Sequence, residues 1–428
     1  HDFVEAAFKA GAGLAVVARD KRDRFAADAR LLIVPDVLDA LRDLARAARA
    51  RSGARVIAVT GSVGKTSTKE ALKLALAADG ETHASAASYN NHWGVPLSLA
   101  RLPETARYAV FEIGMNHAGE ITPLTKIVRP HVAIVTSIAP VHLEYFGTLK
   151  KIADAKAEIF LGVEAGGAAV INRDIRQHAQ LVKAAESAGI SRIVSFGTNR
   201  AADARLLRIS LQPESSTVEA RILDQMVTYK LGAPGKHLVL NSLAVLATVS
   251  LVGADLALAA LALDALKPAA GRGVRAMLRV PGGAALLIDE SYNANPASMA
   301  AAIALLGQTP VGARGRRIAV LGDMLELGVQ GPALHRGLAE PLKVAQIDLV
   351  FCSGPLMHTL WQALPSNRRG GYAEASAELE PAVLAAIRDG DAVMVKGSLG
   401  PKMRPIVKGL ERQFAGPETK DTTAAQGA

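Results

Sequence analysis

The sequence predicts an α/β protein of three domains: a partial N-terminal α/β domain, a central parallel-sheet domain and a C-terminal domain in which strands and helices alternate. Short apolar, β-branched runs alternate with helical patterns along most of the 428 residues, which is typical of parallel sheets. A strand, a glycine loop and a helix follow one another over residues 55–78. The length itself suggests about three domains, at roughly 150 residues each. We expect a partial N-terminal α/β domain with a linker over 1–50, a central domain over 51–269, a C-terminal domain over 270–415 and a disordered tail over 416–428.

In the first two domains, the elements are predicted from their apolar patterns. The N-terminal domain has two apolar runs, at 13–18 and 31–34, and a helical linker over 37–50. The central domain has strand candidates at 55–60, 109–113, 132–136, 168–171 and 193–196, with a helix over 65–78. From 205 to 231 the period changes to two over three short segments. This change predicts an antiparallel patch.

A second alternation of strands and helices begins after a hinge that we expect at 268–273. Its strand candidates are 285–288, 318–321, 349–352 and 392–395. Before the hinge, the most apolar stretch of the chain runs from 243 to 263, but Asp255 interrupts it. A membrane-spanning helix needs about 20 apolar residues with few charges. The stretch therefore predicts two core helices broken at Gly253, and no stable membrane insertion.

Composition excludes several classes of protein. A hydrophobic content of 50% with 21% charged residues excludes a disordered chain. The single cysteine, Cys352, excludes an internal disulfide and a cysteine-built zinc site, and it fits a reducing cytoplasm. The net charge of +9 is scattered along the chain rather than gathered in one run. We therefore expect no nucleic-acid partner.

The strongest local signal is the loop between the strand at 55–60 and the helix that follows. Its residues are Gly61, Ser62, Val63, Gly64, Lys65, Thr66 and Ser67. Glycines allow backbone N–H groups to surround phosphate oxygens at a helix N-terminus. Lys65 would bring positive charge to the β- and γ-phosphates, and the Thr66 hydroxyl would bind Mg²⁺. The full phosphate-loop pattern has a glycine where Val59 stands, so a purely structural turn is the alternative interpretation.

Other polar residues follow the predicted strands of the central domain. Glu112 ends one strand, at the sheet edge where ligands bind in such folds. His142 follows the next strand and could form a second Mg²⁺ or Mn²⁺ site with Glu112. Each of these two residues alone is also typical of a structural contact. Lys156 by itself would be an ordinary lysine on a helix surface.

The C-terminal half adds a further set of polar residues at strand and helix ends. The candidates are Asn241, Arg272, Asp289, Asn293, Asn295 and Lys396. Runs rich in Asp and Asn are normally turns. The run from Asp289 to Asn295 directly follows an apolar strand, so the functional and the structural interpretation both remain open.

Nine segments, in this order, resemble the Mur ligases, the ATP-dependent amide-forming enzymes of peptidoglycan precursor synthesis. The segments are TGSVGKTST (60–68), YNNHWGVPLSL (89–99), FEIGMNHAGEI (111–121), HLEYFGTLKKIADAKAEIF (142–160), GKHLVLN (235–241), GR (271–272), DESYNANPASM (289–299), LGDMLELG (321–328) and VKGS (395–398). The resemblance extends over nearly the whole chain. Segments 289–299 and 321–328 indicate the branch that joins D-alanyl-D-alanine to UDP-N-acetylmuramoyl-tripeptide.

The resemblance implies an N-terminal uridine-nucleotide domain, a central phosphate-loop ATPase domain and a Rossmann-like C-terminal domain. It implies ATP and Mg²⁺ as cofactors, an acyl-phosphate intermediate, and a cytoplasmic monomer that acts on small molecules. By this resemblance, Gly61, Gly64, Lys65 and Thr66 belong to the phosphate loop, and Glu112 and His142 bind a second metal ion. Lys156 corresponds to the lysine that is carbamylated in several members of the family. Contacts to adenine, phosphate and ribose are assigned to Asn241, Arg272 and Asp289, and contacts on the substrate side to Asn90, Asn91, Asn293, Asn295 and Lys396.

The sequence also departs from the family's pattern. Ser137 and Ala139 stand where this branch often has Asn and Gly, and Leu399 replaces the arginine usual after Lys-Gly-Ser. The first part of the uridine-nucleotide domain is expected to be missing. Three alternatives remain open: another ligase of the superfamily, of the diaminopimelate-adding, lysine-adding or folylpolyglutamate type; a phosphate-loop NTPase switch or kinase, which would explain only residues 55–80; and a non-catalytic partner of cell-wall enzymes.

Overall fold

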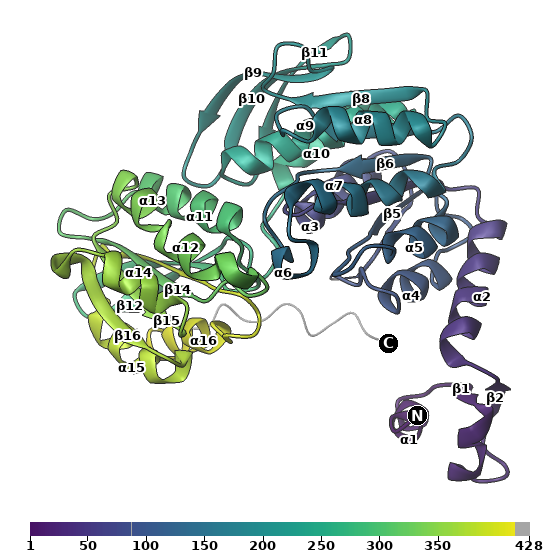
Figure 1. Ribbon diagram of the computed structural model, residues 1–428, viewed down its shortest axis with the longest axis horizontal. Helices are drawn as coiled ribbons and strands as arrows, with labels where there is room; N and C mark the ends of the chain where they lie inside the picture. Colours follow the sequence, from purple (N-terminus) through teal and green to yellow (C-terminus); the bar gives the residue numbers. More distant parts are fainter. Residues whose placement is uncertain (87, 416–428) are drawn as a thin grey trace.

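The structure is a computed structural model that describes residues 1–86 and 88–415. The tail expected to be disordered, 416–428, lies outside the described residues. Three sheets organise the chain, with two, nine and six strands. Figure 1 shows the six-stranded part at one end of the molecule, the nine-stranded part in the middle, and the two-stranded part at the other end. The α/β prediction with mostly parallel sheets is confirmed.

The N-terminal unit is small and is joined to the rest by one helix. Its elements are α1 (Val4–Lys9), β1 (Ala15–Ala18), the 3₁₀ helix η1 (Arg19–Arg24), β2 (Leu31–Val34) and α2 (Val37–Arg51). Strands β1 and β2 pair in parallel. Helix α2 begins where the Asp36 side chain accepts the Asp39 N–H, which is a typical N-cap. Near its other end, buried Arg49 donates to the carbonyls of Val128 and Arg129, so the linker is anchored on the central domain.

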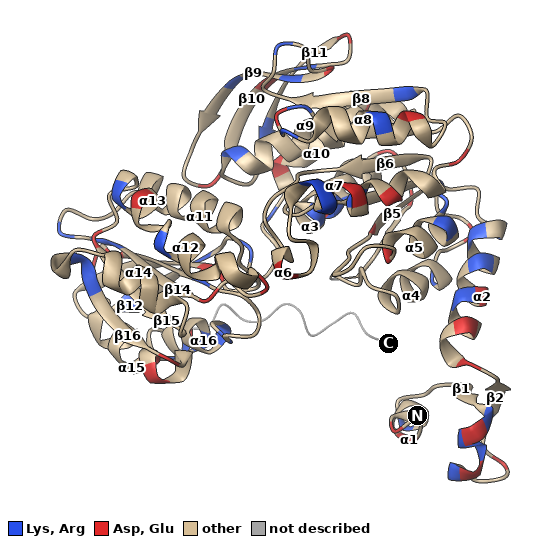
Figure 2. Cartoon of the chain, viewed as in Figure 1, with Lys and Arg blue, Asp and Glu red and all other residues tan. Residues whose placement is uncertain are grey.

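Charged residues are distributed over the whole chain rather than gathered on one element. Figure 2 shows Lys and Arg interspersed with Asp and Glu, with several of both signs on α2. On that helix, Arg42 pairs with Asp39, and Arg46 pairs with Asp43. Pairs of this spacing are typical of a solvated helix face.

The central domain is built on the nine-stranded sheet. Its strands are β3 (Arg55–Thr60), β4 (Thr82–Ala84), β5 (Tyr108–Glu112), β6 (Val132–Val135), β7 (Ala168–Asn172), β8 (Arg192–Gly197), β9 (Ala204–Leu211), β10 (Ser216–Ile222) and β11 (Gln225–Leu231). Their order is β11-β10-β9-β8-β7-β6-β3-β5-β4. Strand β10 is antiparallel to both of its neighbours, which confirms the predicted antiparallel patch. Strand β3, which leads into the glycine loop, lies between β5 and β6.

Helices cover both faces of this sheet. They are α3 (Lys65–Ala77), α4 (Gly94–Ala100), α5 (Ile121–Val128), α6 (Leu143–Phe146), α7 (Leu149–Ala157), η2 (Glu158–Gly162), α8 (His178–Ser187), α9 (Lys236–Leu251), α10 (Leu256–Ala262) and η3 (Leu263–Ala265). Along β3, Ile57 and Val59 pack with α3 and α9, while Val56 and Ala58 pack with α4 and α5. Burial on both faces explains why the strand is apolar throughout.

The apolar stretch from 243 to 263 forms parts of α9 and α10, separated near Gly253, as predicted. Nine residues of α9 are buried, so this stretch belongs to the core of the central domain. Within residues 1–86 and 88–415, no helix has both the length and the apolar character needed to cross a bilayer.

The C-terminal domain has a six-stranded sheet. Its strands are β12 (Val274–Val280), β13 (Gly283–Glu290), β14 (Arg317–Gly322), β15 (Leu349–Ser353), β16 (Arg369–Ala373) and β17 (Ala392–Lys396), in the order β12-β13-β17-β14-β15-β16. Only β12 runs antiparallel to its neighbour. The helices are α11 (Pro296–Gln308), η4 (Gly328–Gln330), α12 (Gly331–Arg336), α13 (Ala339–Val344), α14 (Met357–Ala363), η5 (Ser366–Arg368), α15 (Ser376–Ala386) and α16 (Arg404–Gln413). Cys352 is buried in β15, and burial raises its pKa to about 12, so it is an inert core thiol.

Candidate functional site

The glycine loop after β3 has a backbone that only glycine fits. Gly61 and Gly64 have φ values of 150° and 90°, in the region that side chains disfavour. A Cβ on Gly61 would collide with Thr136 Oγ1, and one on Gly64 would lie 2.6 Å from Asn241 Nδ2. Both glycines therefore allow close packing at the N-terminus of α3, where N–H groups point away from the helix.

The loop is held against the segment that follows β6. Ser62 N–H donates to the Ser137 carbonyl at 2.9 Å, and Val63 N–H donates to Ser137 Oγ at 3.0 Å. Ser62 Oγ also donates to the Ala139 carbonyl at 3.1 Å. The two positions that depart from the family's usual sequence, Ser137 and Ala139, thus contact the phosphate loop directly. The Ser137 hydroxyl takes up one of the loop's N–H groups.

Two lysines lie close together beside the loop. Lys65 Nζ donates to the Gly61 carbonyl at 2.8 Å. Burial lowers the pKa of Lys65, the Glu112 charge opposes this shift, and Arg272 adds to it. Lys156 is 1% exposed, and burial together with the charge of Lys65 holds its pKa well below the usual value. Lys156 is therefore not the surface lysine that its helix pattern alone indicated, and the region favours a bound anion.

Glu112 lies at the carboxyl end of β5, where its carboxylate contacts the side chains of Thr66 and Asn90. Its carboxylate is 1% exposed. It accepts hydrogen bonds from Thr66 Oγ1 at 2.8 Å and from Asn90 Nδ2 at 2.7 Å. Carboxylate, hydroxyl and amide oxygens are the ligands that Mg²⁺ prefers. Among the described residues, no group of three or more His, Cys, Asp or Glu side chains is arranged to hold a metal by itself.

His142 lies at the N-terminus of α6 with a positive φ of 53°. Its Nδ1 atom is hydrogen-bonded to the carboxylate of Glu326, from the C-terminal domain. Burial lowers the pKa of His142; Glu326 opposes this, and Lys156 and Lys65 add to it. The structure therefore brings His142, Lys156 and Lys65 within electrostatic reach of one another. Sequence reasoning missed Glu326, although segment 321–328 places a carboxylate shortly after a predicted strand.

Two of the three predicted nucleotide contacts, Asn241 and Arg272, act on residues of the loop or of the helix that follows it, and the third, Asp289, bonds within its own segment. Asn241 on α9 donates to Ser67 Oγ at 3.4 Å. The Arg272 guanidinium stacks 4.4 Å from the centre of the Tyr292 ring, and its charge acts on Lys65. Asp289 Oδ1 accepts from the N–H and the hydroxyl of Ser291.

The predicted substrate residues make contacts within the protein. Asn91 Oδ1 accepts N–H groups at the start of α4. Asn293 Oδ1 accepts the next backbone N–H, and Asn295 caps α11. Lys396 Nζ donates to Glu290 Oε2 and to the Asn293 carbonyl, both at 3.0 Å. Their contacts to substrate stay predictions.

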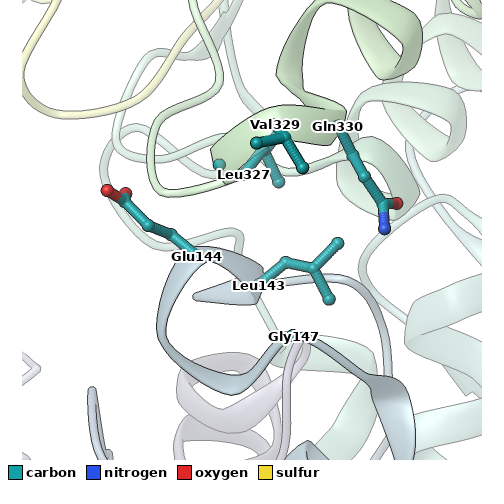
Figure 3. A pocket seen from close by; sticks show the side chains of 7 residues that line it. Leu143, Glu144, Gly147, Leu327, Val329 and Gln330 are labelled. Carbon is teal, nitrogen blue, oxygen red and sulfur yellow. The ribbon is translucent and has the colours of Figure 1, made fainter.

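A hollow of about 560 Å³ lies between the central and C-terminal domains. Leu143, Glu144 and Gly147 line it from one side, and residues 327–330 line it from the other. Figure 3 shows Leu143 of α6 facing Leu327, Val329 and Gln330 across this space. The hollow adjoins the His142–Glu326 contact rather than the phosphate loop.

A phosphate loop on a parallel sheet, faced by a second α/β domain that reaches it through Arg272, defines a nucleotide-dependent enzyme of two cooperating domains. Residues 59–249 match the family model of the Mur ligase middle domain, and residues 277–399 match that of the Mur ligase glutamate ligase domain. The chain belongs to the Mur ligase family, whose members are ATP-dependent amide ligases.

Similar proteins support this membership over nearly the full length. The UDP-N-acetylmuramoyl-tripeptide--D-alanyl-D-alanine ligase of Escherichia coli is 35% identical, over 96% of this chain and 88% of its own. A crystal structure of MurF from Acinetobacter baumannii is 30% identical and matches with a TM-score of 0.84, over 96% of this chain and 88% of that one. MurF from Thermotoga maritima in complex with ADP is 26% identical and matches with a TM-score of 0.80, over 97% and 92%.

Proposed function

We propose that this protein joins D-alanyl-D-alanine to UDP-N-acetylmuramoyl-tripeptide, with ATP converted to ADP and phosphate. The observation that carries the proposal is the phosphate loop, with Lys65 and Lys156 beside it and Glu112 bonded to Thr66. The named activity of the E. coli and Rickettsia prowazekii relatives, at 35% and 31% identity over almost the whole chain, supports the choice of substrates. A phosphate-loop switch would leave His142, Lys156 and Asp289 without a role.

The residues of the site suit a reaction between two anions. A carboxylate is a poor electrophile, so ATP first phosphorylates it to an acyl phosphate. The amine of the dipeptide then attacks the acyl carbon, and phosphate leaves. Lys65 and Arg272 would offset the negative charge that accumulates where ATP and the carboxylate meet. Closure of the C-terminal domain would exclude water from the acyl phosphate.

We assign Mg²⁺ to two sets of residues. Thr66 and Glu112, whose oxygens already lie 2.8 Å apart, offer the hard ligands that this cation prefers. Glu112, His142 and Lys156 would form the second set. A carbamate on Lys156 would replace a buried cation with an oxygen anion, and carbamate formation needs the neutral amine that a lowered pKa favours. Bound there, Mg²⁺ would neutralise phosphate charge.

The remaining assignments are proposals of the same kind. The nucleotide contacts are Asn241, Arg272 and Asp289; the substrate contacts are Asn90, Asn91, Asn293, Asn295 and Lys396. The domain boundaries are 1–50, 51–269 and 270–415, with uridine-nucleotide binding in the first. We also propose that the protein is a cytoplasmic monomer.

The decisive experiment measures phosphate release from ATP with UDP-N-acetylmuramoyl-tripeptide, with and without D-alanyl-D-alanine. Release that needs all three substrates, together with an amide product of the expected mass, supports the proposal. Panels with diaminopimelate, lysine or glutamate as the amine test the other ligases of the superfamily. ATP turnover that is independent of both other substrates would contradict the proposal.

A further inference from the structure

The loop after β14 forms hydrogen bonds with the central domain through one of its residues, Glu326. Among the described residues, and apart from the bond between Arg272 and Ala269 within the connecting segment, both hydrogen bonds that cross between the nine-stranded and six-stranded domains involve Glu326. Its carboxylate bonds His142 Nδ1, and its carbonyl accepts the Glu144 N–H at 3.1 Å. Helix α6, which His142 precedes, lies on the side of the central domain nearest the C-terminal domain (Figure 1). Glu326 thus holds a candidate metal ligand from the opposite domain.

The residues before Glu326 are fixed to their own domain. Each of the three preceding residues makes a hydrogen bond there. The pairs are Asp323 Oδ1 with Met357 N at 2.7 Å, Met324 N with His335 Nε2 at 2.9 Å, and Leu325 N with Ser398 Oγ at 3.0 Å. Because the loop is fixed up to residue 325, the position of the Glu326 carboxylate follows the position of the whole C-terminal domain.

The backbone on both sides of the contact is in an unfavourable conformation. His142 and Glu326 have φ values of 53° and 62°, although neither is a glycine. Gly328 completes the close approach, since a Cβ there would lie 3.2 Å from Glu144 Cα. Left-handed backbone at non-glycine residues persists where surrounding contacts require it, often at functional sites. Here it occurs at both partners of one hydrogen bond between domains.

We propose that Glu326 is a positioning residue that fixes the tautomer and orientation of His142 when the C-terminal domain closes. The carboxylate accepts the proton on Nδ1, which leaves Nε2 as the imidazole nitrogen able to bind a cation. A carboxylate that holds a ligating histidine in this way raises its basicity and orients the ring. Closure of the C-terminal domain is therefore coupled to the tautomer and the orientation of the His142 ring. This inference rests on the proposed role of His142 in binding a divalent cation.

The first test observes the histidine itself, in the metal-free protein at neutral pH. The full chain is labelled with ¹⁵N-histidine, and the His142 ring signals are assigned as those lost in His142→Gln. We expect the Nδ1–H tautomer to dominate in the parent and in Glu340→Ala, which removes an exposed carboxylate of the same domain. In Glu326→Ala the tautomer ratio should shift toward Nε2–H. Identical ring signals in the parent and in Glu326→Ala would overturn the proposal.

The second test measures Mn²⁺ binding by electron paramagnetic resonance in the presence of ADP. Loss of a residue that orients a metal ligand typically weakens binding by about 10- to 100-fold, so we expect at least about a tenfold loss in Glu326→Ala. Glu326→Gln, whose amide oxygen still accepts the ring proton, should lose less Mn²⁺ affinity. This variant also keeps the test valid if Glu326→Ala fails to fold. Equal affinity in all three proteins would overturn the proposal. If His142→Ala binds Mn²⁺ like the parent, the proposed metal site is wrong, while the ring signals still decide whether Glu326 orients His142.

Discussion

At the scale of single residues, the main property of the site is unbalanced positive charge. The charge of Arg272 lowers the pKa of Lys65, the charge of Lys65 lowers the pKa of Lys156, and burial lowers both. Glu112 is the carboxylate whose charge acts on Lys65. Such an arrangement favours binding of a polyphosphate, because the anion supplies the missing negative charge.

Lys65→Ala should abolish most turnover and leave the fold intact. Lys65 would stabilise phosphate charge that grows in the transition state, and the loss of one such donor typically costs about 10²- to 10³-fold in kcat. Steady-state phosphate release measures the loss. Lys73→Ala, an exposed lysine on the same helix, is the control and should behave like the parent. An unchanged kcat in Lys65→Ala would mean that the loop is structural.

Lys156→Ala should lose activity that small carboxylates, such as formate or acetate, partly restore. A free carboxylate can occupy the space of the carbamate and supply its oxygen ligands. Lys151→Ala, exposed on the same helix, controls for general effects of the salts. Parent-like activity of Lys156→Ala without any added carboxylate would exclude the carbamate.

At the scale of elements, α11 shows how one residue can serve stability and function. Asn295 and Ser298 form a reciprocal capping box at its N-terminus. Asn295→Ala should therefore lower the free energy of unfolding by about 1 kcal/mol, measured by urea denaturation. Asn295→Asp keeps the cap and should restore the stability. If Asn295 also contacts substrate, the KM for the acceptor rises in both variants. Unchanged stability in Asn295→Ala would contradict the capping role.

Sequence alone predicts the buried strands and misses three strands at sheet edges. Strand β3 and the strands β5 to β8 are apolar because helices cover both faces of the sheet, so their pattern is visible in the sequence. Three strands were not predicted: β12, which carries Arg275 and Arg279; β16, which begins Arg-Gly-Gly; and β4, which has three residues. β12, β16 and β4 lie at sheet edges, where one side faces no neighbour and charge or glycine is tolerated.

The site was predictable to the extent that its residues follow strands. Glu112 is the last residue of a buried strand, and the loop 61–67 directly follows another. Their proximity at one edge of the sheet could therefore be inferred. The burial of Lys156 and the contact of Glu326 with His142 depend on how helices and domains pack together. No periodicity in the local sequence records such packing, and this is why both features appeared only in the structure.

At the scale of the whole molecule, we expect stability to fall as the pH decreases below about 6.5. Burial lowers the pKa of several histidines, including fully buried His335. The unfolded chain then binds protons below about 6.5 that the folded protein excludes, so acid favours unfolding. Scanning calorimetry between pH 7.5 and 5.5 measures the slope.

His335 provides the specific check of this pH dependence. Its Nε2 accepts the Met324 N–H, and its Nδ1 lies 2.7 Å from the Gly331 carbonyl, which fits the neutral ring. His335→Gln should be less stable at pH 7.5 and should have a shallower pH slope than the parent. His358→Gln, at an exposed histidine, should keep the parent's slope. An unchanged slope in His335→Gln would remove this residue as a cause.

The strand order of the nine-stranded sheet also determines when the nucleotide site can form while the ribosome synthesises this chain. Strand β3 pairs on one side with β5 and on the other with β6, so that Ile57 lies next to Val132. The loop after β3 is held by Ser137 and Ala139, which follow β6. As the chain leaves the ribosome from its N-terminus, the loop emerges long before the residues that hold it. We therefore expect ATP to stabilise the nascent domain only after the residues that follow β6 have left the ribosome, and the distant pairing of β3 with β6 to form slowly.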